Sequence, residues 1–447
     1  MSIFHACDIR GIAGTELTDE MAARIARAVG VKLSGQRVVV GGDIRLSTPR
    51  LQQIMIEGLL ASGCRVINIG TVATPVFYFA QKLTGATGGV MVTASHNPAA
   101  YNGFKLVLGV QPVSEADIAE IAGLVDRNAG VTGNGTLEEA AVIADYLSYT
   151  AGQAKPGSMK VVIDAGNGAT AKIAPALYRK AGFEVVELFC DPDGNFPNRP
   201  PNPALPKNLA ALSKKVVETG AALGIAFDGD GDRVGFVDET GRAVDNDDIL
   251  VLLARHYLEH QPGPVIYDAK CSMVVPEQIT AAGGRPVMAR AGHTFSKAAF
   301  LREKALFAGE ISGHFFFSEL GYDDGMFAGL KMCEYLTSHG LLAALIDEIP
   351  NYLLTPEVRV RYEAPDKETV LAEVAGNLKH LKPNLIDGVR IEFADGWAMI
   401  RASVTEPLFT LRFEARSSER LRVIANLLLD ALPDRVRHKV ITQMPEL

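Results

Sequence analysis

One pattern recurs three times along the chain and limits how it can fold. An apolar strand is followed by a helix, by a glycine just after the helix, and by a second strand, as in the stretch from Arg37 to Ile69. The three glycines that end the helices are Gly63, Gly182 and Gly283. Strands that alternate with helices form mostly parallel sheets, whose ligands bind beyond the carboxyl ends of the strands. The repeat therefore predicts three related α/β domains in succession.

The last ninety or so residues follow another pattern, because their strand-like runs stand in direct succession. We expect strands at 357–361, 388–393, 397–400 and 409–413, and helices at 366–380 and 418–432. This order indicates a fourth, antiparallel α+β module. The expected domains are 1–141, 142–242, 243–353 and 354–447. The stretch from Asp191 to Pro206 is rich in proline and is expected to be a rigid, irregular excursion within the second domain.

Composition narrows the class of protein. The chain has 447 residues, of which 48% are hydrophobic, so it can build several cores. A net charge of −8 without a run of Lys and Arg argues against a nucleic-acid partner. Five scattered cysteines without a C-x-x-C pair fit a reducing compartment and no zinc site. No apolar run reaches the ~20 residues of a membrane span, and the start does not resemble a signal peptide, so we expect a cytoplasmic protein without a membrane partner.

Ser95 follows an apolar run that reads as a short buried strand. The apolar run Gly89–Val92 ends abruptly in Thr93–Pro98, whose Asn-Pro closes a turn. Ser95, held at the end of a buried strand, is well placed to act as an exposed nucleophile. An ordinary strand-end turn explains the same residues, so the assignment of Ser95 needs support from other parts of the chain.

The stretch Asp228-Gly-Asp-Gly-Asp232-Arg233 is the strongest local signal. Its carboxylates alternate with glycines between two apolar strands, so the backbone can aim all three acids at one point. Converging acids repel one another unless a hard divalent cation such as Mg²⁺ or Ca²⁺ lies among them. An EF-hand does not fit, because Arg233 occupies the position that needs glycine and the flanks read as strands. Open positions on Mg²⁺ are typically taken by phosphate oxygens, so we expect metal and phosphate together.

Two further loops carry polar groups suited to a phosphorylated sugar. In Gly309–His314, Glu310 and Ser312 alternate on one side of the chain, as vicinal sugar hydroxyls require. In Arg401–Pro407, a guanidinium and two hydroxyls offer the groups that hold a phosphate. Each loop alone is also compatible with an ordinary turn. Three more residues near strand ends are candidate cations for the same cleft: Lys105, Lys270 and His293.

Together, the four loops resemble those of the α-D-phosphohexomutase superfamily, most closely its bacterial phosphomannomutase/phosphoglucomutase branch. The match covers the whole chain in order, with one loop in each domain. The resemblance implies three Rossmann-like α/β domains with mixed, mostly parallel sheets, a C-terminal α+β domain, and a cleft where the four meet. In order, these are the phosphoserine domain, the metal-binding domain, the sugar-binding domain and the phosphate-binding domain.

The resemblance also implies roles for individual residues. Ser95 carries a phosphate, and one Mg²⁺ per chain is bound by that phosphate and by Asp228, Asp230 and Asp232. Two groups of further positions match the family's motifs. The residues matching catalytic positions are Arg10, Lys105, Arg233 and His314, and those matching substrate contacts are Lys270, His293, Glu310, Ser312, His314, Arg401, Ser403 and Thr405.

The implied reaction is a reversible phosphoryl transfer between hexose 1-phosphate and 6-phosphate. Ser95 phosphate passes to the 6-hydroxyl, the bisphosphorylated sugar turns over, and Ser95 takes the 1-phosphate back. Mg²⁺, Arg233 and Lys105 supply charge stabilisation, while Lys105 and His314 are both candidates for moving the proton. Hexose 1,6-bisphosphate is the expected activator. Phosphosugars are the expected partners, and the chain is expected to be a monomer or a weak homo-oligomer.

The sequence leaves the sugar open. Ile311 resembles the sugar loop of enzymes that act on mannose and glucose phosphates, which favours mannose with glucose as well. Phosphoglucosamine mutase is the alternative enzyme, and a non-catalytic, metal-dependent sugar-phosphate binding protein or a metal-dependent phosphatase are alternatives from other classes. Cys7 stands where the family often has an aromatic residue, and Val404 where it often has asparagine or glycine.

Overall fold

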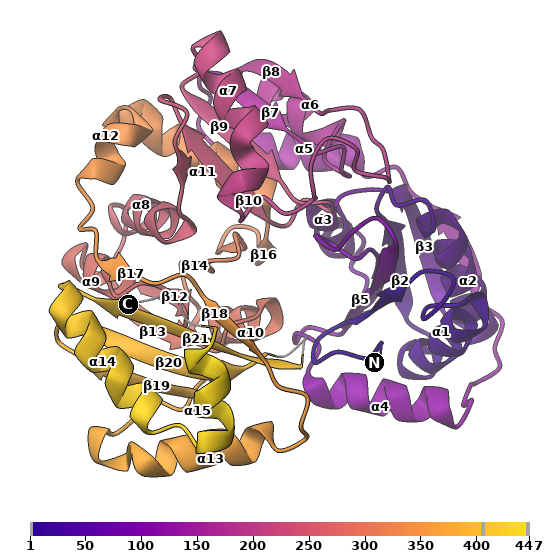
Figure 1. Cartoon of the computed structure of the whole chain (residues 1–447). Helices are drawn as coiled ribbons and strands as arrows, with labels where there is room; N and C mark the ends of the chain where they lie inside the picture. The colour runs from indigo at the N-terminus through magenta and orange to yellow at the C-terminus, as the bar shows by residue number, and fades with distance from the viewer. Residues whose placement is uncertain (1–2, 404–406, 444–447) are drawn as a thin grey trace.

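The computed structural model describes residues 3–403 and 407–443. Four β-sheets follow one another along the chain, and Figure 1 shows them around a common centre, the first in indigo and the last in yellow. Among the described residues, no helix combines the length and apolar character that crossing a membrane requires.

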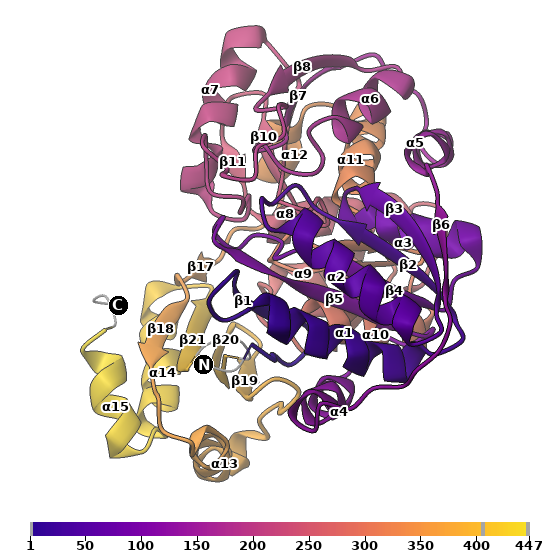
Figure 2. The same ribbon diagram turned by 90° about the vertical axis from the view of Figure 1, so that its right-hand side faces the viewer.

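The first sheet has the strand order β1-β5-β4-β2-β3-β6. Its strands are β1 (Ile9–Ile12), β2 (Arg37–Gly42), β3 (Arg65–Thr71), β4 (Gly88–Val92), β5 (Tyr101–Leu108) and β6 (Thr136–Glu139). Its helices are α1 (Asp19–Leu33), α2 (Thr48–Ala61), α3 (Thr74–Thr84) and α4 (Glu115–Asp126). Strands β4, β2, β3 and β6 are parallel, and β5 and β1 add an antiparallel edge. Helices α1 and α2 lie side by side on one face, as Figure 2 shows.

The second sheet has the strand order β11-β10-β9-β7-β8. Its strands are β7 (Lys160–Asp164), β8 (Glu184–Leu188), β9 (Leu223–Phe227), β10 (Val234–Asp238) and β11 (Ala243–Val244). Its helices are α5 (Ile143–Gly152), α6 (Ile173–Lys180), the short 3₁₀ turn η1 (Pro206–Leu209) and α7 (Ala210–Thr219). Strands β8, β7 and β9 are parallel, while β10 runs antiparallel to β9. The acidic loop joins β9 to β10. The proline-rich stretch before η1 forms no helix or strand, as its sequence predicts.

The third sheet has the strand order β13-β12-β14-β15-β16. Its strands are β12 (Pro264–Asp268), β13 (Arg285–Ala289), β14 (Phe307–Gly309), β15 (Phe315–Phe317) and β16 (Tyr322–Asp323). Its helices are α8 (Asn246–Leu258), α9 (Val274–Ala281), α10 (His293–Glu303), α11 (Gly325–His339) and α12 (Leu342–Asp347). The plan of the second sheet recurs: three parallel strands carry antiparallel neighbours on one side.

The fourth sheet is antiparallel, with the order β17-β21-β20-β19 and β18 also paired to β21. Its strands are β17 (Leu353–Leu354), β18 (Val358–Arg361), β19 (Val389–Phe393), β20 (Gly396–Ala402) and β21 (Leu408–Ala415). Its helices are α13 (Lys367–Asn377), the 3₁₀ turn η2 (Lys379–Leu381), α14 (Ser418–Asp430) and α15 (Asp434–Ile441). The predicted fold class, three α/β domains with mixed sheets and a C-terminal α+β domain, is confirmed.

The apolar cores divide the molecule unequally. One continuous cluster of buried side chains runs through the first three domains and includes Phe77, Ile225 and Phe327. The fourth domain has a core of its own, and a small cluster around Met273 and Trp397 joins it to the third. The first three domains are therefore one packed body, to which the fourth is attached.

Gly329 in α11 tests this shared core. An added β-carbon there would clash with the Tyr178 hydroxyl, which donates to the carbonyl of Met326 at 2.9 Å. Overpacking of this kind costs about 1–3 kcal/mol, so Gly329→Ala should lower the thermal unfolding midpoint measured by calorimetry. Gly376→Ala in α13 is the control, because its β-carbon meets open space. It should leave the midpoint equal or slightly higher. Equal midpoints for the two variants would contradict the packing argument.

Candidate functional site

The four predicted loops lie where strands end. The serine loop follows β4, the acidic loop joins β9 to β10, the Glu310–His314 loop joins β14 to β15, and the Arg401 loop follows β20. The first three leave the carboxyl ends of strands from parallel parts of their sheets, which is where α/β sheets place ligand sites.

Ser95 is held in an unusual conformation. Its φ angle is +48°, in the left-handed region that a residue with a β-carbon rarely adopts, and the residue is 1% exposed. Its N–H donates to the Thr93 hydroxyl at 2.9 Å, and its own hydroxyl donates to Asp228 at 2.6 Å. The hydroxyl also lies 3.3 Å from Nδ1 of His96. The predicted serine and the predicted acidic loop therefore meet directly.

A buried arginine holds the serine loop in place. The guanidinium of Arg45 pairs with Asp43 at 3.1 Å, and both side chains are fully buried. Its terminal nitrogens donate at 2.7–2.9 Å to four backbone carbonyls, those of Ser95, Asn97, Pro98 and Tyr101. These bonds over-determine the loop backbone, which is what a strained conformation needs in order to persist. The sequence signal is the Gly42-Asp-Ile-Arg45 run after β2, which was not predicted to be part of the site.

The acidic cluster is buried and carries its own counterion. Asp228, Asp230 and Asp232 are each 0% exposed. Lys105 on β5 donates to Asp230 at 2.7 Å and also pairs with Asp232. Burial raises the pKa of Asp228 well above its ordinary value, and the charges of Asp230 and Asp232 add to the effect. Burial opposes the charge of Lys105, but the two carboxylates outweigh it and raise its pKa well above the ordinary value.

The acidic cluster fits a hard divalent cation. The three carboxylates offer oxygen atoms that lie within 4.8 Å of one another. Asp230 Oδ1 and Asp232 Oδ1 are buried and have no hydrogen-bond partner among the described residues. These two open oxygens are available to an ion, and carboxylate oxygens are the ligands that Mg²⁺ and Ca²⁺ prefer. The residues present therefore suit such a cation.

A second polar cluster joins the acidic loop to the third domain. Arg233 donates from Nε to Nε2 of His314 at 3.0 Å, and the backbones of these two residues form an isolated bridge. Nδ1 of His314 lies 2.8 Å from one oxygen of Asp323, and Nε2 of His293 lies 2.9 Å from the other. Asp323 thus orients both predicted histidines. Asp323 was not predicted from the sequence, because only the folded sheet brings it between two histidines that stand 9 and 30 residues before it.

Arg10 also faces the serine loop. It donates to the side-chain oxygen of Asn97 at 2.9 Å and pairs with Asp8 at 2.6 Å. Its Nε is buried and has no hydrogen-bond partner among the described residues.

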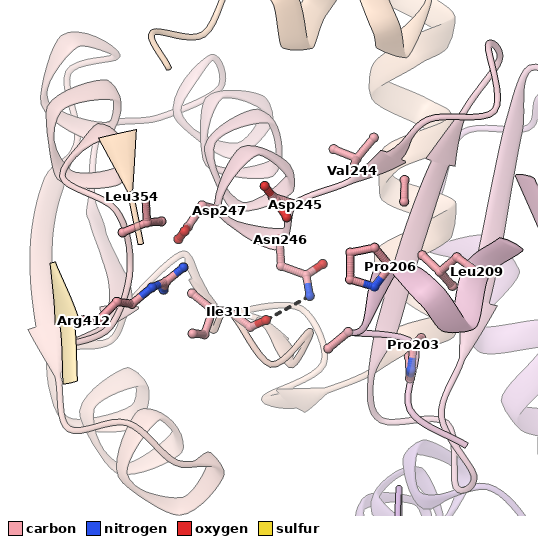
Figure 3. Close-up of a pocket in the computed structure, with 12 residues that line it drawn as sticks. Pro203, Pro206, Leu209, Val244, Asp245, Asn246, Asp247, Ile311, Leu354 and Arg412 are labelled. Atoms are coloured by element: carbon pink, nitrogen blue, oxygen red, sulfur yellow. Dashed lines mark hydrogen bonds between the residues drawn. The ribbon is translucent and has the colours of Figure 1, made fainter. Parts of the chain in front are cut away.

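Glu310 and Ser312 share one side of their loop, as predicted. The Ser312 hydroxyl donates to Glu310 Oε2 at 2.9 Å, while Glu310 Oε1 is buried without a hydrogen-bond partner in the described chain. That oxygen can accept a hydrogen bond from a hydroxyl group of a ligand. Ile311 lines a cavity of about 170 Å³ between the second, third and fourth domains, where Asn246 donates to its carbonyl at 3.0 Å, as Figure 3 shows.

The fourth loop is described only in part. Arg401 donates from Nε to Asp387 at 2.7 Å, and the Ser403 N–H donates to the carbonyl of Leu408 at 2.9 Å. Thr405 and Val404 lie outside the described residues. Lys270 lies at the boundary between the third and fourth domains, with Nζ 3.8 Å from Glu357. Hydrogen bonds and ion pairs therefore join one group of predicted residues into a single site: Ser95, Arg10, Lys105, the three aspartates, Arg233, His293 and His314. The side-chain contacts of Arg401 and Lys270 described above are instead with residues of the fourth domain.

Four family models match successive parts of the chain. They describe the α/β/α domains I, II and III and the C-terminal domain of phosphoglucomutase/phosphomannomutase. They match residues 1–130, 142–241, 245–352 and 357–431.

Curated relatives and solved structures agree with these matches. The chain is 40% identical to a phosphomannomutase/phosphoglucomutase of Pseudomonas putida, over 95% of this chain and 94% of the relative. It is 39% identical to a phosphoglucomutase of Neisseria meningitidis, over 95% of each. A crystal structure of a phosphoglucomutase/phosphomannomutase family protein from Burkholderia thailandensis matches with a TM-score of 0.90 and 37% identity, covering 96% of both chains.

Gly229 tests the contact between the serine and acidic loops. A β-carbon at Gly229 would clash with the backbone carbonyl of Ser95, so Gly229→Ala should push the two loops apart and turn Asp228 and Asp230. Disturbing the support of metal ligands typically weakens binding about 10- to 100-fold, and we expect such a loss for Mg²⁺ and Mn²⁺ in calorimetric titrations. Gly376→Ala should bind both ions like the unchanged protein. Unchanged affinity in Gly229→Ala would show that the close approach does not shape the acidic site.

Proposed function

The chain belongs to the phosphoglucomutase/phosphomannomutase family and is a hexose phosphate mutase, and we propose that it interconverts the 1- and 6-phosphates of mannose and of glucose through a phosphate carried on Ser95. The observation that carries the proposal is the direct contact of Ser95 with Asp228 at 2.6 Å. A serine buried against an acidic cation site has the surroundings of a phosphate carrier, because the cation offsets the charge of the phosphate.

Substrate binding is divided between the third and fourth domains in this proposal. Arg401, Ser403 and Thr405 hold the phosphate that does not react, with Lys270 and His293 as further contacts. Glu310 accepts hydrogen bonds from the 3- and 4-hydroxyls of the sugar, and the Ser312 hydroxyl donates to them. The open Oε1 of Glu310 supports this role, because a buried carboxylate oxygen without a partner is costly unless a ligand supplies one.

The phosphoryl transfer itself depends on positioning and charge. The 6-hydroxyl attacks the phosphorus on Ser95, the bond from phosphorus to Ser95 Oγ breaks, and the sugar becomes bisphosphorylated. The attacking hydroxyl loses a proton, and Ser95 Oγ gains one when its bond to phosphorus breaks. We assign the first proton to His314 as acceptor and the second to Lys105 as donor, because the raised pKa of Lys105 keeps its ammonium protonated. Asp323 fixes the ring of His314 through Nδ1. The other ring nitrogen, Nε2, which accepts a hydrogen bond from Arg233, is therefore held towards the acidic loop. Arg10, Arg233 and Lys105 surround the transferred group with positive charge.

We propose Mg²⁺ as the cation, held by Asp228, Asp230, Asp232 and a phosphate oxygen on Ser95. When bound, Mg²⁺ would stabilise the charge that develops on the transferred phosphate. After the sugar turns over, Ser95 accepts the 1-phosphate and the 6-phosphate leaves. Hexose 1,6-bisphosphate acts as activator, because it restores the phosphate on Ser95 when the intermediate escapes.

The choice of sugar rests on the relatives and on the Glu310–His314 loop. The Pseudomonas relative is named for both mannose and glucose phosphates, and the Neisseria relative for glucose phosphate. Neither name includes glucosamine. We further propose four domains, 1–141, 142–242, 243–353 and 354–447, in a monomer or weak homo-oligomer of the cytoplasm.

A substrate panel tests the proposed reaction. Mannose, glucose and glucosamine 1-phosphates are each supplied with Mg²⁺ and a catalytic amount of hexose 1,6-bisphosphate, and products are followed by ³¹P NMR. We expect mannose and glucose 6-phosphates without free phosphate. Release of free phosphate as the main product would indicate a phosphatase, and binding without turnover a sugar-phosphate receptor. A preference for glucosamine would overturn the choice of sugar but not the mutase chemistry.

The phosphate on Ser95 has a separate test. Intact-protein mass spectrometry after incubation with hexose 1,6-bisphosphate should show one added phosphoryl group, which Ser95→Ala removes together with nearly all activity. Ser148→Ala, on the exposed face of α5, is the control and should keep both. An Ser95→Ala variant that retained full activity without another phosphorylated residue would exclude Ser95 as the carrier.

A further inference from the structure

Four charged side chains from three domains lie in series beside the phosphate loop. Arg401, at the end of β20, donates to Asp387 Oδ2 at 2.7 Å. Asp387 Oδ1 lies 3.7 Å from Nε of Arg290, which follows β13 in the third domain. The same guanidinium is 3.0 Å from Glu115, in the first turn of α4 in the first domain. We call these four residues the charge series.

The charge series begins with a fixed pair. The side chain of Asp387 is 4% exposed, and its Oδ2 accepts a second hydrogen bond from the N–H of Ala291 at 3.2 Å. The next residue, Gly388, has φ +80° and lies so close to the backbone of Ile400 and Arg401 that a β-carbon would clash there. The loop that carries Asp387 is therefore packed directly against the strand that carries Arg401. This packing fixes the carboxylate relative to the guanidinium.

The geometry of the pair suits anion binding. Asp387 engages Nε of Arg401, so it does not occupy the two terminal nitrogens, which can bind two phosphate oxygens side by side. A lone carboxylate beside a phosphate would repel it. Arg290 offsets that repulsion, because its positive charge faces the other oxygen of Asp387. The positive charge of Arg401 then remains available to attract the phosphate of the ligand.

Arg290 also makes contacts outside the fourth domain, which carries the phosphate loop. Its guanidinium lies over the ring of Phe295 at 4.2 Å and reaches Glu115 from there. Glu115 is about half exposed and Arg290 about one-third, so their ion pair is weak and salt-sensitive. Arg290 and Glu115 belong to the third and first domains, which share one packed core, so this pair ties Arg290 to the body on which the fourth domain sits.

We propose that Asp387 is a positioning residue that sets the guanidinium of Arg401 for the substrate's phosphate, and that Arg290 holds Asp387 in place from the third domain. The inference rests on the proposed function of Arg401 and deepens it. Asp387 itself touches no substrate and acts through Arg401 alone. Loss of Asp387 therefore weakens binding of the distal phosphate and leaves the chemistry at Ser95 intact.

Steady-state kinetics with glucose 1-phosphate test the positioning role. Asp387→Ala should raise KM about tenfold and change kcat less than about threefold, because only binding shared by ground state and transition state is lost. Asp387→Asn keeps an acceptor for Arg401 but places an amide against Arg290, and should raise KM by a smaller factor. Asp395→Ala is the matched control, since Asp395 pairs with Arg420 at 3.0 Å in the same domain, away from Arg401. It should leave KM and kcat unchanged.

A double-mutant cycle tests the role of Arg290. Arg290→Met should raise KM about threefold, and Arg290→Met combined with Asp387→Asn should be no worse than Asp387→Asn alone, because both remove the same contact. Additive effects would overturn the role of Arg290. A fall in kcat at unchanged KM in Asp387→Ala would overturn the role of Asp387, and if that variant fails to fold, the same criterion applies to Asp387→Asn.

Failure of the inference and failure of the proposed function give different results. Calorimetric titration of glucose 6-phosphate and glucose 1-phosphate into the unchanged protein and into Asp387→Asn requires no turnover. Inactive protein that still binds both sugars, with weaker binding in Asp387→Asn, would reject the mutase reaction and keep the positioning role. If the unchanged protein is active and both proteins bind the sugars equally well, the mutase reaction would be kept and the positioning role of Asp387 rejected.

Discussion

The burial of three carboxylates at one point is the constraint on which the rest of the structure depends. Asp228, Asp230 and Asp232 come from a single turn of the second domain, and backbone N–H groups of that turn donate to Asp228, but several of the groups that make their burial tolerable come from the first domain. Lys105 supplies charge, while the hydroxyls of Thr74 and Thr93 donate to Asp230 at 2.7 and 3.1 Å. Because unpaired buried charges are so costly, the first and second domains must dock before the acidic loop is stable. The site is thus also the seam that holds these two domains together.

The same constraint explains the strain at Ser95. To reach Asp228, the serine leaves β4 with a left-handed backbone, and the loop offers no glycine to relax it. The cost of order 1–3 kcal/mol for such a residue is offset by the carbonyl contacts of Arg45. In the proposed reaction Ser95 transfers a phosphate and recovers it, so it needs one fixed position. Rigid support by a fully buried guanidinium provides that position better than a flexible turn would.

Local patterns in the sequence predicted the three strand–helix–strand repeats, strands β18 to β21, the positions of the four loops and the fold class, because period, turn residues and alternating carboxylates are readable within a few residues. Strands such as β1, β6 and β16 were not predicted. The supporting residues could not be found in this way. Arg45 acts on a carbonyl fifty positions away, and Asp323 matters only because the sheet brings it between two histidines. Lys270 illustrates the converse. It was a candidate cation near a strand end, as Lys105 was, but it lies beside Glu357 at the boundary with the fourth domain. Position after a strand identifies a candidate, and only the packing of whole domains decides which residues it meets.

The division of the apolar core indicates which part of the molecule can move. The first three domains share one cluster of buried side chains, so separating them would expose a large apolar surface. The fourth domain keeps its core to itself and meets the third through the small cluster around Trp397 and through Glu414, which accepts the N–H of Met273 at 2.7 Å. A body attached by so little apolar area and by polar contacts can rotate without unfolding. The proposed reaction requires this asymmetry. Ser95 and the acidic loop must stay fixed while a sugar enters, turns and leaves, and the domain that carries Arg401 is the one whose movement costs least.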